Sequence, residues 1–147
     1  MRTLILFLAL VAHPYSLSGA RIGDNLDQFS DSHLNAFCGR ETPTMVVCEQ
    51  DDATYVGRRA YLRAEFTDRQ MTYLSLTLSA DAAVAKKISA SLEKEYGKYT
   101  DMGDGLPDSY YAYWSPSDST ENLRVSYTSA AQNGLGHPVL RVSLAAK

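Results

Sequence analysis

Residues 59–78 read RAYLRAEFTDRQMTYLSLTL, and this stretch decides the fold. Apolar and polar side chains alternate over 59–66, and they alternate again over 73–78 after the polar turn at 67–70. A period of two places each set of side chains on its own face of a strand. The two runs therefore predict a β-hairpin with one buried face and one open face.

Weaker patterns on both sides of the hairpin predict the remaining elements. Apolar side chains spaced by four over 84–96, followed by Gly97, predict an amphipathic helix with a glycine at its C-terminal end. Helical spacing of apolar positions predicts a short first helix over 24–35. Short apolar or alternating runs predict further strands at 45–48, 110–114, 123–128 and 138–144, and a loop is expected at 100–109.

Together these patterns predict an α+β fold. We expect an antiparallel sheet of five to six strands, with one long helix packed on one face and a short N-terminal helix. The sequence shows no internal repeat, linker or low-complexity tract. One face of the predicted sheet is left open, and it is available to a partner.

The first twenty residues have the pattern of a secretory signal peptide. Arg2 gives the leader a positively charged n-region, and the run Leu4–Ala12 is apolar. The residues SGA at 18–20 are small, as the residues before a signal peptidase cleavage site are. The apolar run has about half of the ~20 residues that a membrane-spanning helix needs. We therefore expect a signal peptide at 1–20, a single domain at 21–147, and a soluble periplasmic or secreted product.

Cys38 and Cys48 are the only cysteines of the chain. In an oxidising compartment two cysteines this close usually pair, so we expect a structural disulfide. A zinc site would need further ligands, and neither His33 nor His137 lies at metal-ligand spacing from the cysteines. A redox role would need a Cys-x-x-Cys motif, which the sequence lacks. We expect no metal and no cofactor.

The acidic net charge limits the classes of partner that the chain is expected to bind. The net charge is −3, and removal of Arg2 with the leader makes it one unit more negative. An acidic balance argues against general nucleic-acid binding, which relies on an excess of Lys and Arg. No cysteine follows the leader at the place where a lipoprotein is lipidated, so we expect no stable membrane anchor.

A set of residues spread along the chain resembles the pattern of a group of small exported proteins. They are the run YVGRRA at 55–60, Phe66, Leu74, the stretch LEKEYG at 92–97, and Trp114. In these positions the chain resembles small exported bacterial α+β domains of unassigned function. It is also similar in size and layout to outer-membrane assembly lipoproteins of the SmpA/OmlA type, which carry a lipidated cysteine that is absent here. The resemblance implies an accessory role in envelope assembly.

No set of catalytic residues stands out. A nucleophile needs a base beside it, and the histidines after the leader are only His33 and His137. A Gly-x-Ser-x-Gly elbow is absent. Asp51 and Asp52 are adjacent, so they point to opposite faces of a strand and converge only in a turn.

The loop DMGDGLPD at 101–108 is a candidate cation site. Its carboxylates belong to Asp101, Asp104 and Asp108, and Ca²⁺ prefers oxygen ligands. The spacing differs from that of an EF-hand loop. The alternative interpretation is a polar connection between the long helix and the next strand.

The open face of the sheet is the candidate binding surface. Arginine and tyrosine side chains gather there if the alternation also holds in the last strands, and both residue types often dominate binding energy at protein interfaces. The predicted binding residues are Arg59, Tyr61, Arg63, Tyr73, Arg124 and Arg141. The alternative interpretation is an ordinary solvated face. A second candidate is the aromatic cluster Tyr96, Tyr99, Tyr110, Tyr111, Tyr113 and Trp114.

These observations favour a binding role over an enzymatic one. The leading hypothesis is an exported module that docks an extracytoplasmic protein with an acidic surface, as an inhibitor or immunity-type protein against an envelope enzyme. A second hypothesis is a small hydrolase of envelope polymers that uses carboxylates such as Asp51, Asp52 or Asp104. A third is an accessory of outer-membrane assembly.

Overall fold

A computed structural model describes residues 15–106 and 109–147, and in this part of the chain the fold is mostly sheet. Eight strands form one antiparallel sheet: β1 Phe37–Arg40, β2 Met45–Tyr55, β3 Arg58–Thr67, β4 Gln70–Leu78, β5 Asp101–Leu106, β6 Ser109–Trp114, β7 Glu121–Thr128 and β8 Val139–Ala146. The helices are α1 Leu26–Ser32, α2 Ala82–Tyr96 and α3 Ala130–Asn133.

The sheet has the strand order β1-β2-β3-β4-β8-β7-β6-β5. A helix followed by a four-stranded meander therefore occurs twice, first as α1 with β1–β4 and then as α2 with β5–β8. The two meanders join where β4 pairs with β8 in antiparallel orientation. This arrangement is a structural repeat that the amino-acid sequence does not reveal.

The predicted fold was wrong in strand number and helix number, because the sheet has eight strands and the described chain has three helices. The prediction missed β1, which is only four residues long, and β5, which was taken for part of a loop because of its glycines. In β5, Gly103 lies against the ring of Tyr111, and a Cβ atom at Gly103 would lie 2.0 Å from that ring. The glycine thus permits a close approach between strands, as glycines within sheets often do.

The hairpin of β3 and β4 has the predicted alternation. Ala60, Leu62 and Ala64 are buried, and the residues between them are more exposed. The amphipathic helix predicted over 84–96 is present as α2, which begins after Asp81 and ends before Gly97. The Asp81 side chain accepts a hydrogen bond from the backbone N–H of Val84, as an N-cap does.

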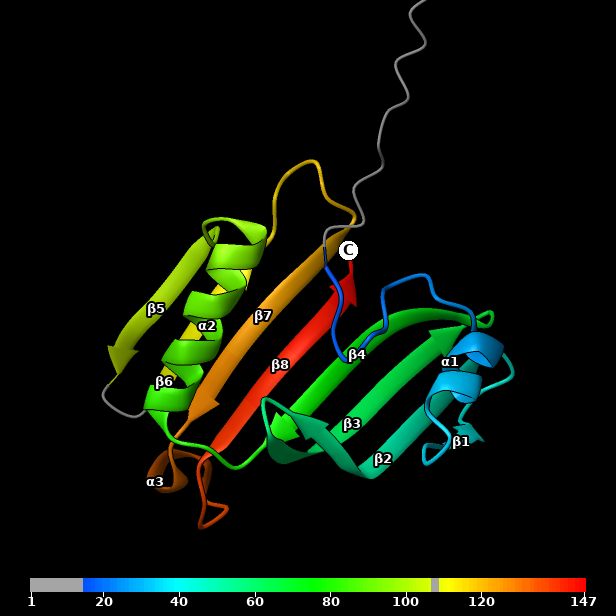
Figure 1. The fold of residues 1–147 in the computed structure, drawn as a ribbon, viewed down its shortest axis with the longest axis horizontal. Coiled ribbons are helices and arrows are strands. Elements are labelled where there is room, and N and C mark those ends of the chain that lie inside the picture. Colours follow the sequence, from blue (N-terminus) through cyan, green and yellow to red (C-terminus); the bar gives the residue numbers. More distant parts are fainter. Residues whose placement is uncertain (1–14, 107–108) are drawn as a thin grey trace, which may run out of the picture.

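Helices α1 and α2 lie on the same face of the sheet, and each covers its own half (Figure 1). Between them runs the segment 15–25, whose apolar side chains join the core (Figure 1). Figure 1 also shows α3 beside the end of the sheet, in the β7–β8 connection. No described helix covers the opposite face, which is therefore the open face of the sheet.

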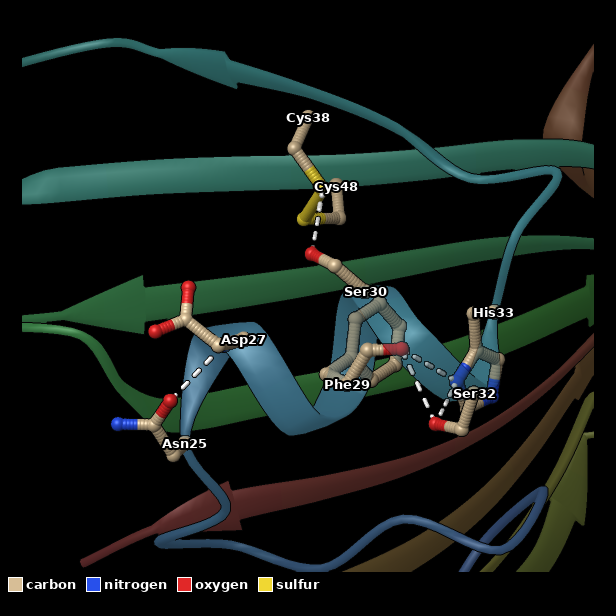
Figure 2. Close-up of a disulfide and its surroundings, with 8 residues drawn as sticks. All are labelled: Asn25, Asp27, Phe29, Ser30, Ser32, His33, Cys38 and Cys48. Carbon is tan, nitrogen blue, oxygen red and sulfur yellow. Dashed lines mark hydrogen bonds between the residues drawn. A yellow bond between two sulfur atoms is a disulfide. The ribbon is translucent and has the colours of Figure 1, made fainter.

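The predicted disulfide is confirmed between Cys38 and Cys48. These residues lie opposite each other on β1 and β2, so the bond ties the short edge strand to the sheet. Figure 2 shows the disulfide beside α1, where the Oγ atom of Ser30 lies 3.9 Å from the Sγ atom of Cys38. Phe29 of the same helix packs against Phe66 of β3, with ring centroids 5.3 Å apart.

Candidate docking face

The open face has a row of residues that crosses the sheet in register. From β1 to β5 this row consists of Phe37, Glu49, Arg63, Ser75, Ser143, Arg124, Tyr113 and Asp101. The residues on the two central strands, Ser75 and Ser143, are small, and larger side chains flank them on both sides. A hollow of the open face lies beside Ser143, between these larger side chains.

This hollow has a volume of about 300 Å³. Its lining residues come from β4, β6, β7 and β8 and are Tyr73, Tyr113, Asn122, Arg124, Ser126, Arg141, Ser143 and Ala145. Aromatic, hydroxyl, amide and guanidinium groups thus surround one depression. None of the lining residues is an aspartate or a glutamate.

The two arginines of the hollow, Arg124 and Arg141, form no ion pair with a described residue. The guanidinium carbon of Arg124 lies 5.7 Å from the centroid of the Tyr111 ring, in a cation–π contact. The Nε atom of Arg141 donates a hydrogen bond of 3.3 Å to Oγ1 of Thr77. Both arginine residues are exposed, so their positive charges are available to a ligand.

Asn122 adds an acceptor to the hollow. Its Oδ1 atom is buried and has no hydrogen-bond partner among the described residues. Buried polar atoms are nearly always hydrogen-bonded, so this acceptor is an exception among the residues that line the hollow.

The β3 half of the face has a different electrostatic arrangement. Arg63 lies 2.9 Å from Glu49 and 3.0 Å from Glu65, and its Nη2 atom lies 3.9 Å from Glu41. Hydrogen bonding to Glu65 is the largest cause that raises the pKa of Arg63. The Tyr61 hydroxyl also donates to Glu49. Arg63 is therefore occupied within the fold, and its charge is neutralised by acidic neighbours.

The structure thus separates the six predicted binding residues. It brings Tyr73, Arg124 and Arg141 together around the hollow. Arg59 is exposed near the β2–β3 turn, where its Nε atom donates to the backbone oxygen of Asp51. Tyr61 and Arg63 belong to the acidic network on β3. A binding role for each of the six residues remains a prediction.

Sequence reasoning missed several lining residues of the hollow. Tyr113 was assigned to the second candidate cluster, whereas Asn122 was not singled out at all. Their participation follows from strand register, since Tyr113 pairs with Arg124, and Asn122 pairs with Ala145. The order of the strands is needed to derive these neighbours.

The aromatic cluster does not form one surface. Tyr110 and Trp114 are core residues, and Trp114 donates a hydrogen bond of 2.9 Å to the backbone oxygen of Gly97. Tyr96 and Tyr99 are partly buried and pack against the core. On the open face, the Tyr111 hydroxyl donates to Asp101, and this hydrogen bond is the largest cause that raises the pKa of Tyr111.

The carboxylate candidates remain separate from the hollow. Asp51 and Asp52 are exposed at the bulge between Gln50 and Ala53, and Asp52 accepts a hydrogen bond from Gln50. Of the predicted cation ligands, the Asp104 side chain and all of Asp108 lie outside the described residues. Among the residues that the structure describes, no three His, Cys, Asp or Glu side chains gather to hold a metal ion.

A larger cleft of about 520 Å³ lies beside α1. His33 lines it, but this ring is stacked on Phe29 at 4.1 Å, and its Nδ1 atom lies 3.1 Å from the Phe29 backbone oxygen. The neighbouring Ser32 hydroxyl donates to backbone oxygens of the same helix. Both side chains are therefore engaged at the end of α1, and the lining of the cleft contains no Asp, Glu, Lys or Arg residue.

Comparison with known proteins provides no family assignment, because no protein-family model, no curated protein and no solved structure matches this chain. Within the described residues, the helices are too short or too polar to cross a membrane. The functional interpretation therefore depends on the geometry of the open face.

Proposed function

We propose that this protein is an exported binding module, which docks an acidic segment of an extracytoplasmic protein on the open face of its sheet. The single observation that carries the proposal is the hollow between β4 and β6, where Arg124 and Arg141 have no acidic partner among the described residues. An arginine side chain can bind a carboxylate through two parallel hydrogen bonds.

The surroundings of the arginines support a protein ligand. Tyr73 and Tyr113 flank the hollow with large aromatic surfaces, and tyrosine and arginine frequently provide the anchors of protein interfaces. These residues stand on paired neighbouring strands, so their backbone positions are fixed before binding. The glutamates Glu49 and Glu65 around Arg63 would repel an acidic segment of the partner. This repulsion favours binding on the β7–β8 half of the open face.

Export is part of the proposal. The leader pattern at the start of the sequence and the disulfide between Cys38 and Cys48 both suit an oxidising compartment outside the cytoplasm. An envelope enzyme with an acidic surface fits this setting, and the chain would then act as its inhibitor or immunity-type partner.

The proposal is tested by affinity capture from a cell-envelope extract with three immobilised proteins. They are the wild type, the double variant Arg124→Met with Arg141→Met, and the matched control Arg58→Met. Arg58 is exposed at the start of β3 and does not line the hollow. Methionine keeps an apolar side chain of similar length and removes the charge.

We expect a partner that the wild type and the Arg58→Met control retain and that the double variant loses. Its binding should weaken as salt rises, because salt screens exposed charges. Purified partner is then titrated calorimetrically against the three proteins. Equal affinity for the double variant and the wild type would show that the hollow is not the docking site.

A further inference from the structure

The segment Tyr15–Ala20 lies inside the sequence predicted as a signal peptide, but the fold uses it as part of the core. Tyr15, Leu17 and Ala20 are 2%, 3% and 2% exposed. They belong to the same cluster as the buried residues of both meanders. A cleavage after Ala20 would remove all three side chains from the folded domain.

Tyr15 has specific contacts on two elements that are distant in sequence. Its ring packs edge-to-face on Tyr96 of α2, with centroids 5.1 Å apart. Its backbone N–H donates a hydrogen bond of 3.2 Å to Glu121 of β7, which is 2% exposed. Burial is the largest cause that raises the pKa of Tyr15, and the charge of Glu121 is the second.

The residues after Tyr15 are also held in place. The backbone N–H of Ser16 donates to the Tyr96 hydroxyl at 3.3 Å, and Leu17 and Ala20 exchange two backbone hydrogen bonds in a tight turn. The backbone oxygen of Ser18 lies 3.3 Å from Nε2 of His33, at the end of α1. The segment therefore links the two helices and fills the space between them (Figure 1).

Loss of the segment Tyr15–Ala20 would remove buried side chains from the core and destabilise the domain. Removal of the Tyr15 and Leu17 side chains would expose apolar surface of the core cluster to which they belong, and cavities of this kind are strongly destabilising. The hydrogen bond from Tyr15 to Glu121 would also be lost in a buried position, where lost hydrogen bonds are costly. The small residues at 18–20 are thus better explained by the turn that they form than by a cleavage site.

We propose that the exported protein keeps Tyr15–Ala20, so that any processing of the leader cuts the chain before Tyr15. The nearest small residue before Tyr15 is Ala12, at the end of the apolar run, and His13 and Pro14 lie between the two. In such processing, signal peptidase uses water to hydrolyse one peptide bond, which leaves a carboxylate on the leader and an amine on the mature chain. The retained segment then becomes the N-terminal element of the folded domain.

The amino terminus of the exported product tests this proposal. The full-length chain, with its own leader, is produced in a bacterial host and recovered from the periplasm, and its intact mass and terminal peptide are determined. An amino terminus at or before Tyr15 supports the proposal. An amino terminus at any residue from Ser16 to Arg21 overturns it.

A substitution in the alternative cleavage site provides an independent control. Ser18 is exposed and has a positive φ of 53°, which Asp adopts more easily than most residues. Ser18→Asp places a charge two residues before Ala20, where signal peptidase requires a small residue. We expect an unchanged amino terminus in this variant. A shift or block of processing would show that Ala20 is the site and would overturn the proposal.

Thermal unfolding measures whether the domain needs the segment. Chains that begin at residue 13 and at residue 21 are compared, and the shorter chain should unfold at least about 10 °C lower. Tyr15→Ala in the longer chain should give a smaller loss in the same direction, and it keeps the comparison informative if the shorter chain does not fold. Equal melting temperatures for all three chains would refute a structural role for the segment.

Discussion

Replacing Arg63 with methionine tests whether the open face is divided into a structural half and a free half. The variant keeps much of the aliphatic side chain but removes contacts of 2.9 Å to Glu49 and 3.0 Å to Glu65, together with the longer contact to Glu41. The Arg63 side chain is 31% exposed, so solvent screens these ion pairs in part. The two short pairs should each contribute up to about 1 kcal/mol.

Removal of Arg63 also leaves the Glu49 and Glu65 carboxylates close together without the positive charge between them, and like charges on one sheet face are destabilising. We therefore expect Arg63→Met to lower the free energy of unfolding by about 1–2 kcal/mol at neutral pH and low salt. Arg124→Met loses only a cation–π contact on an exposed face, so its cost should be about 0.5 kcal/mol or less.

Urea denaturation at low and at high salt measures both variants, with Arg58→Met as the control for a change of net charge. The difference between the Arg63 and Arg124 variants should shrink at high salt, because the Debye length falls to about 3 Å at 1 M. If Arg63→Met costs no more than Arg124→Met at low salt, the acidic network does not stabilise the fold. In that case the proposed division of the face is incorrect.

Three further predictions concern stability. Replacing both Cys38 and Cys48 with alanine opens a loop of ten residues and should lower the free energy of unfolding by about 2–3 kcal/mol in urea; an unchanged transition would contradict the disulfide's role. Trp114→Phe removes the donor of the part-buried hydrogen bond to the Gly97 carbonyl, and circular dichroism melts should show a loss of about 0.5–1.5 kcal/mol, whereas a melt equal to the wild type would refute it. Burial is the main cause that raises the pKa of Tyr55 to about 12, so the folded chain holds a proton that the unfolded chain releases near pH 10. Stability should therefore fall between about pH 10 and pH 12 by up to about 3 kcal/mol, and Tyr55→Phe should abolish this contribution; an equal fall in the variant would refute it.

Local patterns were sufficient to predict the elements with strong periodicity. The alternation over 59–78 predicted β3 and β4, and the four-residue spacing predicted α2 with its glycine end. The short strand β1 carries no such pattern, and it is held by pairing with β2 and by the disulfide. The sheet position of β5 depends on a contact between Gly103 and Tyr111, which no local pattern contains.

The sequence was sufficient to predict which arginines share the open face, but not which of them have acidic neighbours. Alternation placed Arg63, Arg124 and Arg141 on one face, and the structure agrees. Whether a guanidinium group is free depends on residues from other strands and loops, such as Glu41 and Glu49 around Arg63. That information comes from register and strand order, so the distinction between occupied and free arginines required the structure.

The location of binding can be measured directly by nuclear magnetic resonance. Isotope-labelled protein is titrated with a short glutamate-rich peptide, and a glutamine-rich peptide of the same length serves as the control. We predict amide shift changes for the glutamate-rich peptide alone, centred on Tyr113, Asn122, Ser126 and Ser143, and we predict that they disappear in the double variant Arg124→Met with Arg141→Met. Shift changes confined to other parts of the protein, or equal changes with both peptides, would contradict an acid-binding hollow on the open face.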